Sequence, residues 1–170
     1  KRDNNVDKYI DPDDGVIVVK NLVKTFGKLR VLKGVSLSVK EGETTVIIGP
    51  SGCGKTVLMK HMIALERPTT GEIYFESQRI DELNEKQLAT IRVQFGFLFQ
   101  GGALFDSLDV FENIIFPIRQ HRKIKDWKAI DELVKTKLAM VGMEGFQNHY
   151  PASLSGGQQK RVALARAISL

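Results

Sequence analysis

The residues best suited to chemistry form one uninterrupted G-x-x-x-x-G-K-[ST] run, Gly49-Pro50-Ser51-Gly52-Cys53-Gly54-Lys55-Thr56. A glycine-rich turn of this kind points successive backbone N–H groups at a polyphosphate. In this pattern Lys55 reaches the outer phosphates, and the hydroxyl of Thr56 ligates the Mg²⁺ that they carry. The N-terminal dipole of the helix that follows attracts the same anion. The run therefore predicts a binding site for a nucleoside triphosphate with Mg²⁺.

Such a phosphate loop requires a strand before it and a helix after it. Residues 44–48 (TTVII) are a β-branched run that is typical of a strand. Residues 55–65 are predicted to form a helix that stops before Pro68, because the residue before a proline avoids the helical region. The alternative, an ordinary Gly/Pro-rich surface turn, is disfavoured by this strand–loop–helix context.

The remaining segments divide into a strand-rich first half and a helical second half. Alternating β-branched and apolar runs predict strands at 16–23, 31–39, 71–75 and 95–99. Helical spacing predicts helices at 84–92, at 110–121 with a kink or interruption at Pro117, at 126–141, and from 157 onward. The apolar stripe of helix 126–141 is interpreted as core packing and comprises Trp127, Ile130, Leu133, Val134, Leu138 and Val141.

The composition indicates one globular domain. The chain has 170 residues, 42% hydrophobic and 26% charged, and no run of about 18 apolar residues that could span a membrane. Its single cysteine, Cys53, rules out an internal disulfide and fits a reducing compartment. A net charge of +5 suits an anionic ligand or a membrane-adjacent position, and no nucleic-acid partner is expected. Residues 1–14 are polar and predict a disordered tail.

A second motif, Leu154-Ser155-Gly156-Gly157-Gln158, begins a helix. A hydroxyl, free N–H groups and the helix dipole converge there, which predicts a second anion site. Alone, Ser-Gly-Gly would be an ordinary loop. Combined with the phosphate loop and the basic, alanine-rich run 159–167, it makes the chain resemble the ATP-binding cassette (ABC) ATPases, whose signature is LSGGQ. The resemblance covers about residues 16–170.

This resemblance implies a fold class and a division of the chain. The expected fold is α/β, a P-loop NTPase cassette with an N-terminal antiparallel β subdomain, a RecA-like parallel sheet that is incomplete here, and a helical signature subdomain. The ABC ATP-binding domain would cover 15–170. Within it, 15–100 would hold the β subdomain and the phosphate-loop core, 101–157 the helical subdomain, and 158–170 the signature helix.

The resemblance also implies ATP and Mg²⁺ as ligands and gives roles to particular residues. Gln100 matches the family's Q-loop glutamine, which contacts Mg²⁺ and the attacking water and relays nucleotide state to a membrane partner. Phe26 stands where the family places an aromatic residue, usually Tyr, that stacks on adenine, and Phe keeps that π-face. A polar strand end for Gln100 and a hairpin-turn hydrophobe for Phe26 remain open alternatives.

The implied site has three parts. Lys55 and Gln100 would be catalytic, and Thr56 and Gln100 would bind the metal. The nucleotide would contact Phe26, Gly49, Pro50, Ser51, Gly52, Cys53, Gly54, Lys55, Thr56, Val57, Ser155, Gly156, Gly157 and Gln158. In the family, the signature residues bind the γ-phosphate held by a second subunit, in a head-to-tail dimer. One cassette alone would then bind ATP and hydrolyse it poorly, because charge stabilisation is the main catalytic contribution in phosphoryl transfer.

A finer resemblance is carried by the run 100–113 (QGGALFDSLDVFEN), with Phe116-Pro117-Ile118-Arg119 after it. It is similar to the ATPase subunits of Mla/MCE-type bacterial lipid transporters. That resemblance implies a transmembrane permease docked around Gln100–Asn113, with Leu104 and Phe105 at the interface rather than in the core. It also implies an MCE-type lipid-binding partner and a peripheral position on the cytoplasmic face of the inner membrane.

The sequence departs from the family pattern at its end. The family continues into an apolar strand that ends in Asp-Glu, a D-loop and a switch histidine, and none of these occurs here; His61, His121 and His149 match no switch context. We therefore expect a fragment, marginally stable and without ATPase activity as an isolated 170-residue polypeptide. The alternatives are a nucleotide-binding fragment that never hydrolyses ATP, and an ABC ATPase that drives no transporter.

Overall fold

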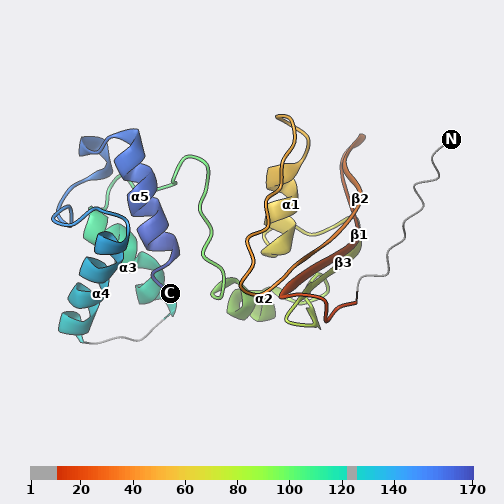
Figure 1. Cartoon of the computed structure of the whole chain (residues 1–170), viewed down its shortest axis with the longest axis horizontal. Coiled ribbons are helices and arrows are strands. Elements are labelled where there is room, and N and C mark those ends of the chain that lie inside the picture. The colour runs from red at the N-terminus through yellow and green to blue at the C-terminus, as the bar shows by residue number, and fades with distance from the viewer. Residues whose placement is uncertain (1–10, 122–125) are drawn as a thin grey trace. The chain divides into compact units, whose positions relative to one another are not determined.

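The computed structural model describes residues 11–121 and 126–170. These residues form two compact units, one that ends at Arg92 and one that begins at Val93 (Figure 1). No helix in the two described ranges is long and apolar enough to cross a membrane.

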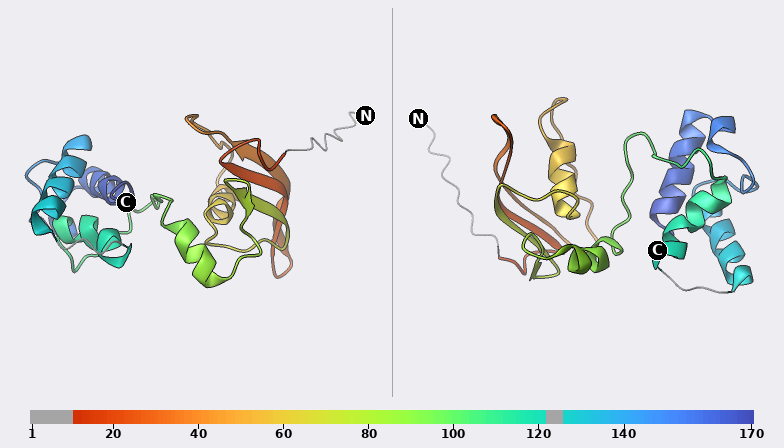
Figure 2. Two further views of the ribbon diagram at one scale, coloured as in Figure 1. Left: turned by 90° about the horizontal axis from the view of Figure 1, so that it is seen from below. Right: turned by 180° about the vertical axis from the view of Figure 1, so that it is seen from behind.

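The first unit contains a four-stranded antiparallel sheet in the order β2-β1-β3-β4. The strands are β1 (Ile17–Phe26), β2 (Leu29–Val39), β3 (Thr70–Phe75) and β4 (Gln78–Arg79). Helix α1 (Lys55–Met62) lies over one face of the sheet (Figures 1 and 2), and α2 (Glu85–Arg92) ends the unit. The antiparallel β subdomain predicted from the resemblance is thereby confirmed.

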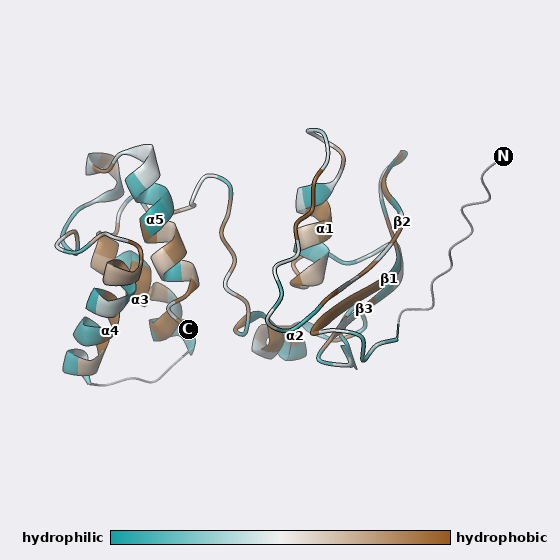
Figure 3. Cartoon of the chain, in the orientation of Figure 1, coloured by the Kyte–Doolittle hydropathy of each residue, from teal (hydrophilic) through white to brown (hydrophobic). Residues whose placement is uncertain are grey.

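Two predicted strands, 44–48 and 95–99, are not part of the sheet that the described residues form. A strand is stable only when its backbone groups have partners on a neighbouring strand, and no strand of the described sheet pairs with either segment. Val46 and Ile48 are consequently 73% and 88% exposed. Figure 3 shows this segment before α1 as hydrophobic. The prediction of strands here is wrong for the described chain, although the sequence has the composition of a strand.

An ion pair ties the turn after α1 to β1. Lys24 Nζ donates to Glu66 Oε1 at 2.6 Å and to the carbonyl of Arg67 at 2.7 Å. The hydrogen bond from Lys24 lowers the pKa of the Glu66 carboxyl. Because the folded-state pKa is lowered, this contribution is present at neutral pH and is lost as the pH falls below about 4.3, the value of an unfolded glutamate.

We therefore expect Glu66→Gln to lower the free energy of unfolding by about 0.5 kcal/mol at pH 7. The loss should shrink towards zero at pH 3, because the wild-type carboxyl is then being protonated as well. Urea unfolding of the full-length protein at both pH values measures the difference. An equal loss at the two pH values would show that the ion pair does not contribute in this way.

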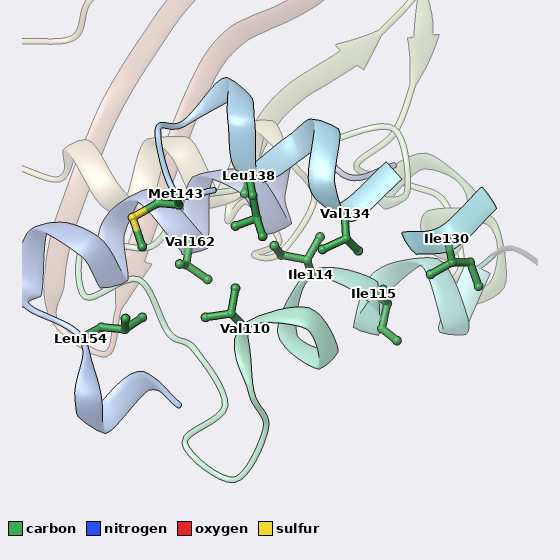
Figure 4. Close-up of a cluster of buried hydrophobic side chains, with 10 residues drawn as sticks. Val110, Ile114, Ile115, Ile130, Val134, Leu138, Met143, Leu154 and Val162 are labelled. Atoms are coloured by element: carbon green, nitrogen blue, oxygen red, sulfur yellow. The ribbon is translucent and has the colours of Figure 1, made fainter. Parts of the chain in front are cut away.

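The second unit is a helical bundle. It contains α3 (Val110–His121), α4 (Trp127–Met140), the 3₁₀ turn η1 (Pro151–Ser153) and α5 (Gly156–Ala167). Figure 4 shows its buried apolar core, formed by Val110, Ile114, Ile115, Ile130, Val134, Leu138, Met143, Leu154, Val162 and Ala165. Helix α3 continues through Pro117 without interruption, with Ile114, Ile115 and Ile118 buried around it.

The apolar stripe of α4 is core only in part. Ile130, Val134 and Leu138 are buried as predicted. Trp127 is 60% exposed, because it opens the helix, beyond the buried face, and the Arg119 guanidinium lies 5.5 Å from its ring centroid. The prediction of core packing is therefore wrong for Trp127.

The predicted disordered tail, 1–14, lies outside the described residues up to position 10. Residues 11–14 differ from the prediction, because they form a turn in which Asp14 N donates to the carbonyl of Asp11 at 3.0 Å. The Ser77 hydroxyl donates to Asp13 Oδ1 and fixes this turn to the chain after β3.

Candidate functional site

The phosphate loop enters α1 along a path that only glycine follows easily. Gly52 and Gly54 have φ values of 77° and 99°, in the left-handed region that disfavours residues with a Cβ. A Cβ on Gly54 would also lie 3.0 Å from Val31 Cγ1. The two glycines are therefore required by the backbone, and β2 fixes the place where the loop meets the helix.

The amine of Lys55 is held over the loop by the loop's own backbone. Its Nζ donates to the carbonyls of Gly49 at 2.8 Å and Pro50 at 2.7 Å. The Sγ of Cys53 lies 3.8 Å from the same nitrogen. An anion that enters the loop would thus meet a positive charge that is already positioned, and charge-assisted hydrogen bonds of this kind are among the strongest in proteins.

The N-terminus of α1 lacks the side-chain cap that the other described α-helices have. In α2 to α5, a backbone N–H of the first turn donates to a side-chain oxygen, of Asn84, Asp109, Asp126 and Ser155 respectively. Helix α1 follows Gly54, and no side chain caps it. Its first N–H groups are therefore available to an anion, and the exposed Thr56 lies in the same turn.

A cleft of about 470 Å³ lies beside α1 in the same unit. Its walls come from α1, the end of β2 and the segment before the loop, namely Val39, Thr45, Val46, Ile47, Lys55, Thr56, Met59 and Met62. Most of these side chains are apolar, so the cleft does not suit a polyphosphate. The donors that a polyphosphate requires are instead those of the loop, namely its backbone N–H groups and the Lys55 amine.

Phe26 lies in the first unit, at the end of β1 and beside the hairpin turn. Its side chain is 45% exposed, and Lys24 Nζ lies 4.8 Å from its ring centroid. The exposed ring is consistent with a stacking surface for a base, and it is equally consistent with a hairpin-turn hydrophobe.

The signature motif caps its own helix. Ser155 Oγ accepts a hydrogen bond from Gln158 N at 3.3 Å, and Gln158 Oε1 accepts one from Ser155 N at 2.8 Å. This capping box consumes acceptors and leaves the hydroxyl proton of Ser155 able to donate outward. The N–H groups of Gly156 and Gly157 have no acceptor within the helix, because they belong to its first turn.

None of the described residues of the second unit requires glycine at positions 156 and 157. Neither residue has a positive φ, and a Cβ on either would meet no atom within 4 Å. Glycine in a helix costs about 0.5–1 kcal/mol relative to alanine. The absence of side chains leaves this backbone open to close approach by another molecule, such as an anion at the helix N-terminus.

Gln100 is exposed, in a turn that Gly102 N closes by donating to the carbonyl of Phe99 at 2.8 Å. Gln100 and the signature motif belong to the second unit, whereas Phe26 and the phosphate loop, with Val57 in the first turn of α1, belong to the first.

The predicted interface residues behave differently from each other. Phe105 is 42% exposed and its ring centroid lies 4.6 Å from that of Phe116, which is 37% exposed. This pair forms an apolar surface. Leu104 is partly buried and packs against the core of the bundle, so it is less exposed than the resemblance implied, and its place at an interface stays a prediction.

Two residues that the sequence did not single out organise this region. Asn113 is fully buried, and its side chain bonds the backbone of the loop that follows Gln100. Arg166 donates from α5 to the same loop. The only sequence signal for the role of Asn113 was a polar residue inside the apolar pattern of α3. Arg166 has no sequence signal beyond its place in a basic run.

Comparison with known families and proteins agrees with this geometry. The model of the ABC transporter family matches residues 32–170. The "probable ribonucleotide transport ATP-binding protein mkl" of Mycobacterium tuberculosis is 44% identical over 91% of this chain and 43% of its own length. The intermembrane phospholipid transport system ATP-binding protein MlaF of Haemophilus influenzae is 42% identical over 93% of this chain and 60% of its own. The chain thus spans about half the length of these relatives.

A solved dimeric structure of a bacterial ABC transporter cassette superimposes with a TM-score of 0.85 at 38% identity, over 90% of this chain and 69% of that one. A post-hydrolysis structure of that cassette, bound to ADP and Pi, gives a TM-score of 0.83 at 37% identity. Since the family model, these sequences and these structures all cover most of the chain, it belongs to the ABC transporter family and has the fold of its ATP-binding cassettes.

Proposed function

We propose that this chain is the nucleotide-binding part of a subunit that hydrolyses ATP to power an ABC transporter. The observation that carries the proposal is the uncapped N-terminus of α1 behind a loop across which Lys55 is already held. The loop N–H groups and Lys55 would bind the phosphates. The hydroxyl of Thr56 is a hard oxygen ligand of the kind that Mg²⁺ accepts, and Gln100 would complete the metal's surroundings.

Bound Mg²⁺ would neutralise charge on the transferring phosphate. The chain's own residues would position the phosphates and stabilise the negative charge that develops on them, which is most of what phosphoryl transfer requires. Because Ser155, Gly156 and Gly157 offer donors outward, we propose that they bind the γ-phosphate held by a second copy. The dimeric state of the solved cassette supports this arrangement.

We propose a phospholipid as the cargo of the complete transporter. The run 100–113 and the likeness to a phospholipid-transport ATPase support this cargo. Other relatives are described by other cargoes, a ribonucleotide in Mycobacterium tuberculosis and methionine for the import protein MetN of Clostridium tetani, which is 39% identical. The partners would be a permease at Gln100–Asn113 and an MCE-type lipid-binding protein, with the subunit on the cytoplasmic face of the inner membrane.

The experiment is purification of the tagged full-length protein from its native membranes in mild detergent. We expect a polytopic membrane protein to co-purify, and ATP hydrolysis by that complex to be stimulated by phospholipid vesicles rather than by methionine or ribonucleotides. Phe105→Ser should release the membrane protein, whereas Leu164→Ser, which alters an exposed apolar residue of α5, should retain it. Recovery of an active ATPase without any membrane protein would favour an ABC ATPase that drives no transporter.

Phe26 gives a separate prediction about the nucleotide base. If its ring stacks on adenine, Phe26→Ala should weaken ATP binding about tenfold, since aromatic contacts contribute about 0.5–1.5 kcal/mol beyond their burial. Phe26→Tyr should preserve affinity. Leu29→Ala, which alters the exposed residue paired with Phe26 across the hairpin, is the matched control. Titration with a fluorescent ATP analogue measures all three, and equal affinity of Phe26→Ala and wild type would favour the hairpin hydrophobe.

A further inference from the structure

The loop that follows Gln100 is held in a strained backbone conformation. Gly102 and Ala103 have φ values of 77° and 49°. Alanine has no side-chain group that favours the left-handed region, so Ala103 adopts it only where surrounding contacts enforce it. Strain of this kind is concentrated at binding and switch segments, and it persists only where surrounding contacts maintain it.

The first of these contacts comes from α3. Asn113 is fully buried, and its Oδ1 accepts a hydrogen bond from Phe105 N at 2.9 Å. Its Nδ2 donates to the carbonyls of Phe105 at 3.1 Å and Leu108 at 3.0 Å. One side chain therefore replaces the hydrogen bonds that regular structure would give this loop.

The second contact comes from α5, the helix that begins at the signature motif. Arg166 Nη2 donates to the carbonyl of Gly102 at 2.9 Å, and Nη1 lies 3.4 Å from Asn113 Oδ1. The guanidinium lies 5.7 Å from the ring centroid of Phe105. Arg166 thus touches the left-handed turn, its α3 anchor and the exposed aromatic surface at once.

The setting of Arg166 is unusual for a charged side chain. Arg166 is half-buried, and burial lowers the pKa of its guanidinium. No carboxylate among the described residues lies within ion-pair distance of it. Arginine is seldom buried without a counter-ion, because its charge is better solvated by water. Neutral partners at its two terminal nitrogens and an aromatic ring near the group compensate for that loss, and they all belong to one loop and its anchor.

The loop backbone also lies directly on α5. A Cβ on Gly102 would come within 3.4 Å of Ala163 Cβ and 3.7 Å of the carbonyl oxygen of Gln159. Arg166 lies about one turn after Ala163 along α5. The loop therefore contacts α5 at two places, at Ala163 and at Arg166. Displacement of the loop must therefore either break these contacts or move the helix.

We propose that Arg166 is a positioning residue. It holds the loop after Gln100 against α5, the signature helix, so that the loop and the helix move together as one rigid body. A partner that displaces Phe105 would move α5 through Arg166, and with it the Ser155 end that faces the nucleotide of the second copy. ATP bound at Ser155 would restrain Phe105 by the same contacts. The inference rests on the proposed function, which assigns ATP to the signature motif and a membrane partner to Phe105.

Hydrogen–deuterium exchange on the full-length protein tests the attachment without any assay of activity. In Arg166→Ala, amides of residues 102–106 should exchange at least about tenfold faster, because their closed state has lost its attachment to α5. Peptides from α4 should be unchanged. Arg161→Ala removes the same charge from an exposed position of the same helix and should leave the loop unchanged.

Ala103→Gly supplies a second comparison. It removes the strain and none of the contacts of Arg166, so the double variant Arg166→Ala/Ala103→Gly should recover part of the slow exchange of the wild type. If Arg166→Ala fails to fold, Arg166→Lys is measured instead. Its amine keeps the charge but lacks the planar, forked geometry of the guanidinium, so its loop exchange should be intermediate.

Hydrolysis by the assembled complex tests the coupling. Arg166→Ala should lower kcat at least about tenfold while the KM for ATP stays within about twofold, because the phosphate loop belongs to the other unit. Unchanged loop exchange in Arg166→Ala, or a kcat equal to that of Arg161→Ala, would overturn the proposal. If the wild-type complex hydrolyses no ATP, the proposed function fails, and the exchange measurement still decides whether Arg166 fixes the loop.

Discussion

Replacing Lys55 with alanine is expected to lower kcat/KM for ATP by about a thousandfold in the full-length protein, equivalent to about 4 kcal/mol of transition-state stabilisation. The amine is held across the loop by the carbonyls of Gly49 and Pro50, so its charge is in place before the nucleotide arrives. Without it, the loop keeps its N–H donors and loses a cation whose position two carbonyls fix. ATP binding should therefore weaken as well as turnover.

Lys60→Ala is the matched control, because it removes a second lysine from the last turn of the same helix. Its hydrolysis should stay within about twofold of wild type, as is usual for a charge outside the site. Steady-state ATPase measurements, with thermal unfolding to confirm that both variants are folded, decide the matter. Comparable losses in the two variants would mean that α1 is merely sensitive to charge.

Gly157→Asp is expected to abolish hydrolysis while leaving the protein at least as stable as wild type. An aspartate in the first turn of α5 interacts favourably with the helix dipole, by about 0.3–1 kcal/mol, and a Cβ at this position meets no other atom within 4 Å. The same carboxylate would stand where the γ-phosphate of the second copy's ATP is proposed to bind. Repulsion between the two anions should lower turnover by at least about a hundredfold.

Ala139→Asp introduces the same charge at an exposed position of α4 and is the control. It should retain hydrolysis. Thermal unfolding and ATPase activity are measured for both variants. For Gly157→Asp, we expect the unfolding temperature to stay the same or rise while the ATPase activity falls. Activity close to wild type in that variant would show that the signature helix does not approach a phosphate.

Local patterns predicted the glycine-rich turn before α1 and the start of a helix near Gly157. The structure has left-handed backbone at Gly52 and Gly54, and α5 begins at Gly156 behind a capping box that the sequence analysis did not predict. The segments 44–48 and 95–99 were mispredicted because a strand depends on a partner that is distant in the chain, which composition does not reveal.

The attachment of the loop after Gln100 could not be predicted for a related reason. Asn113 and Arg166 are 53 positions apart, and Arg166 bonds a turn that lies 64 positions before it in the sequence. Trp127 shows the converse error, since helical spacing places it on the apolar face although the core ends before the first turn of α4. Periodicity identifies a face, and only tertiary packing shows how far along the helix that face is covered.

The most direct test of a shared ATP site is to mix two variants that each lack one half of it. Full-length Lys55→Ala and Gly157→Asp proteins are combined with a non-hydrolysable ATP analogue and examined by sedimentation. Neither variant alone should dimerise in response to nucleotide, and the mixture should form heterodimers with one bound nucleotide each, at the single intact site. Nucleotide-driven dimerisation of either variant alone, or a mixture that stays monomeric, would contradict a site built from the phosphate loop of one copy and the signature helix of another.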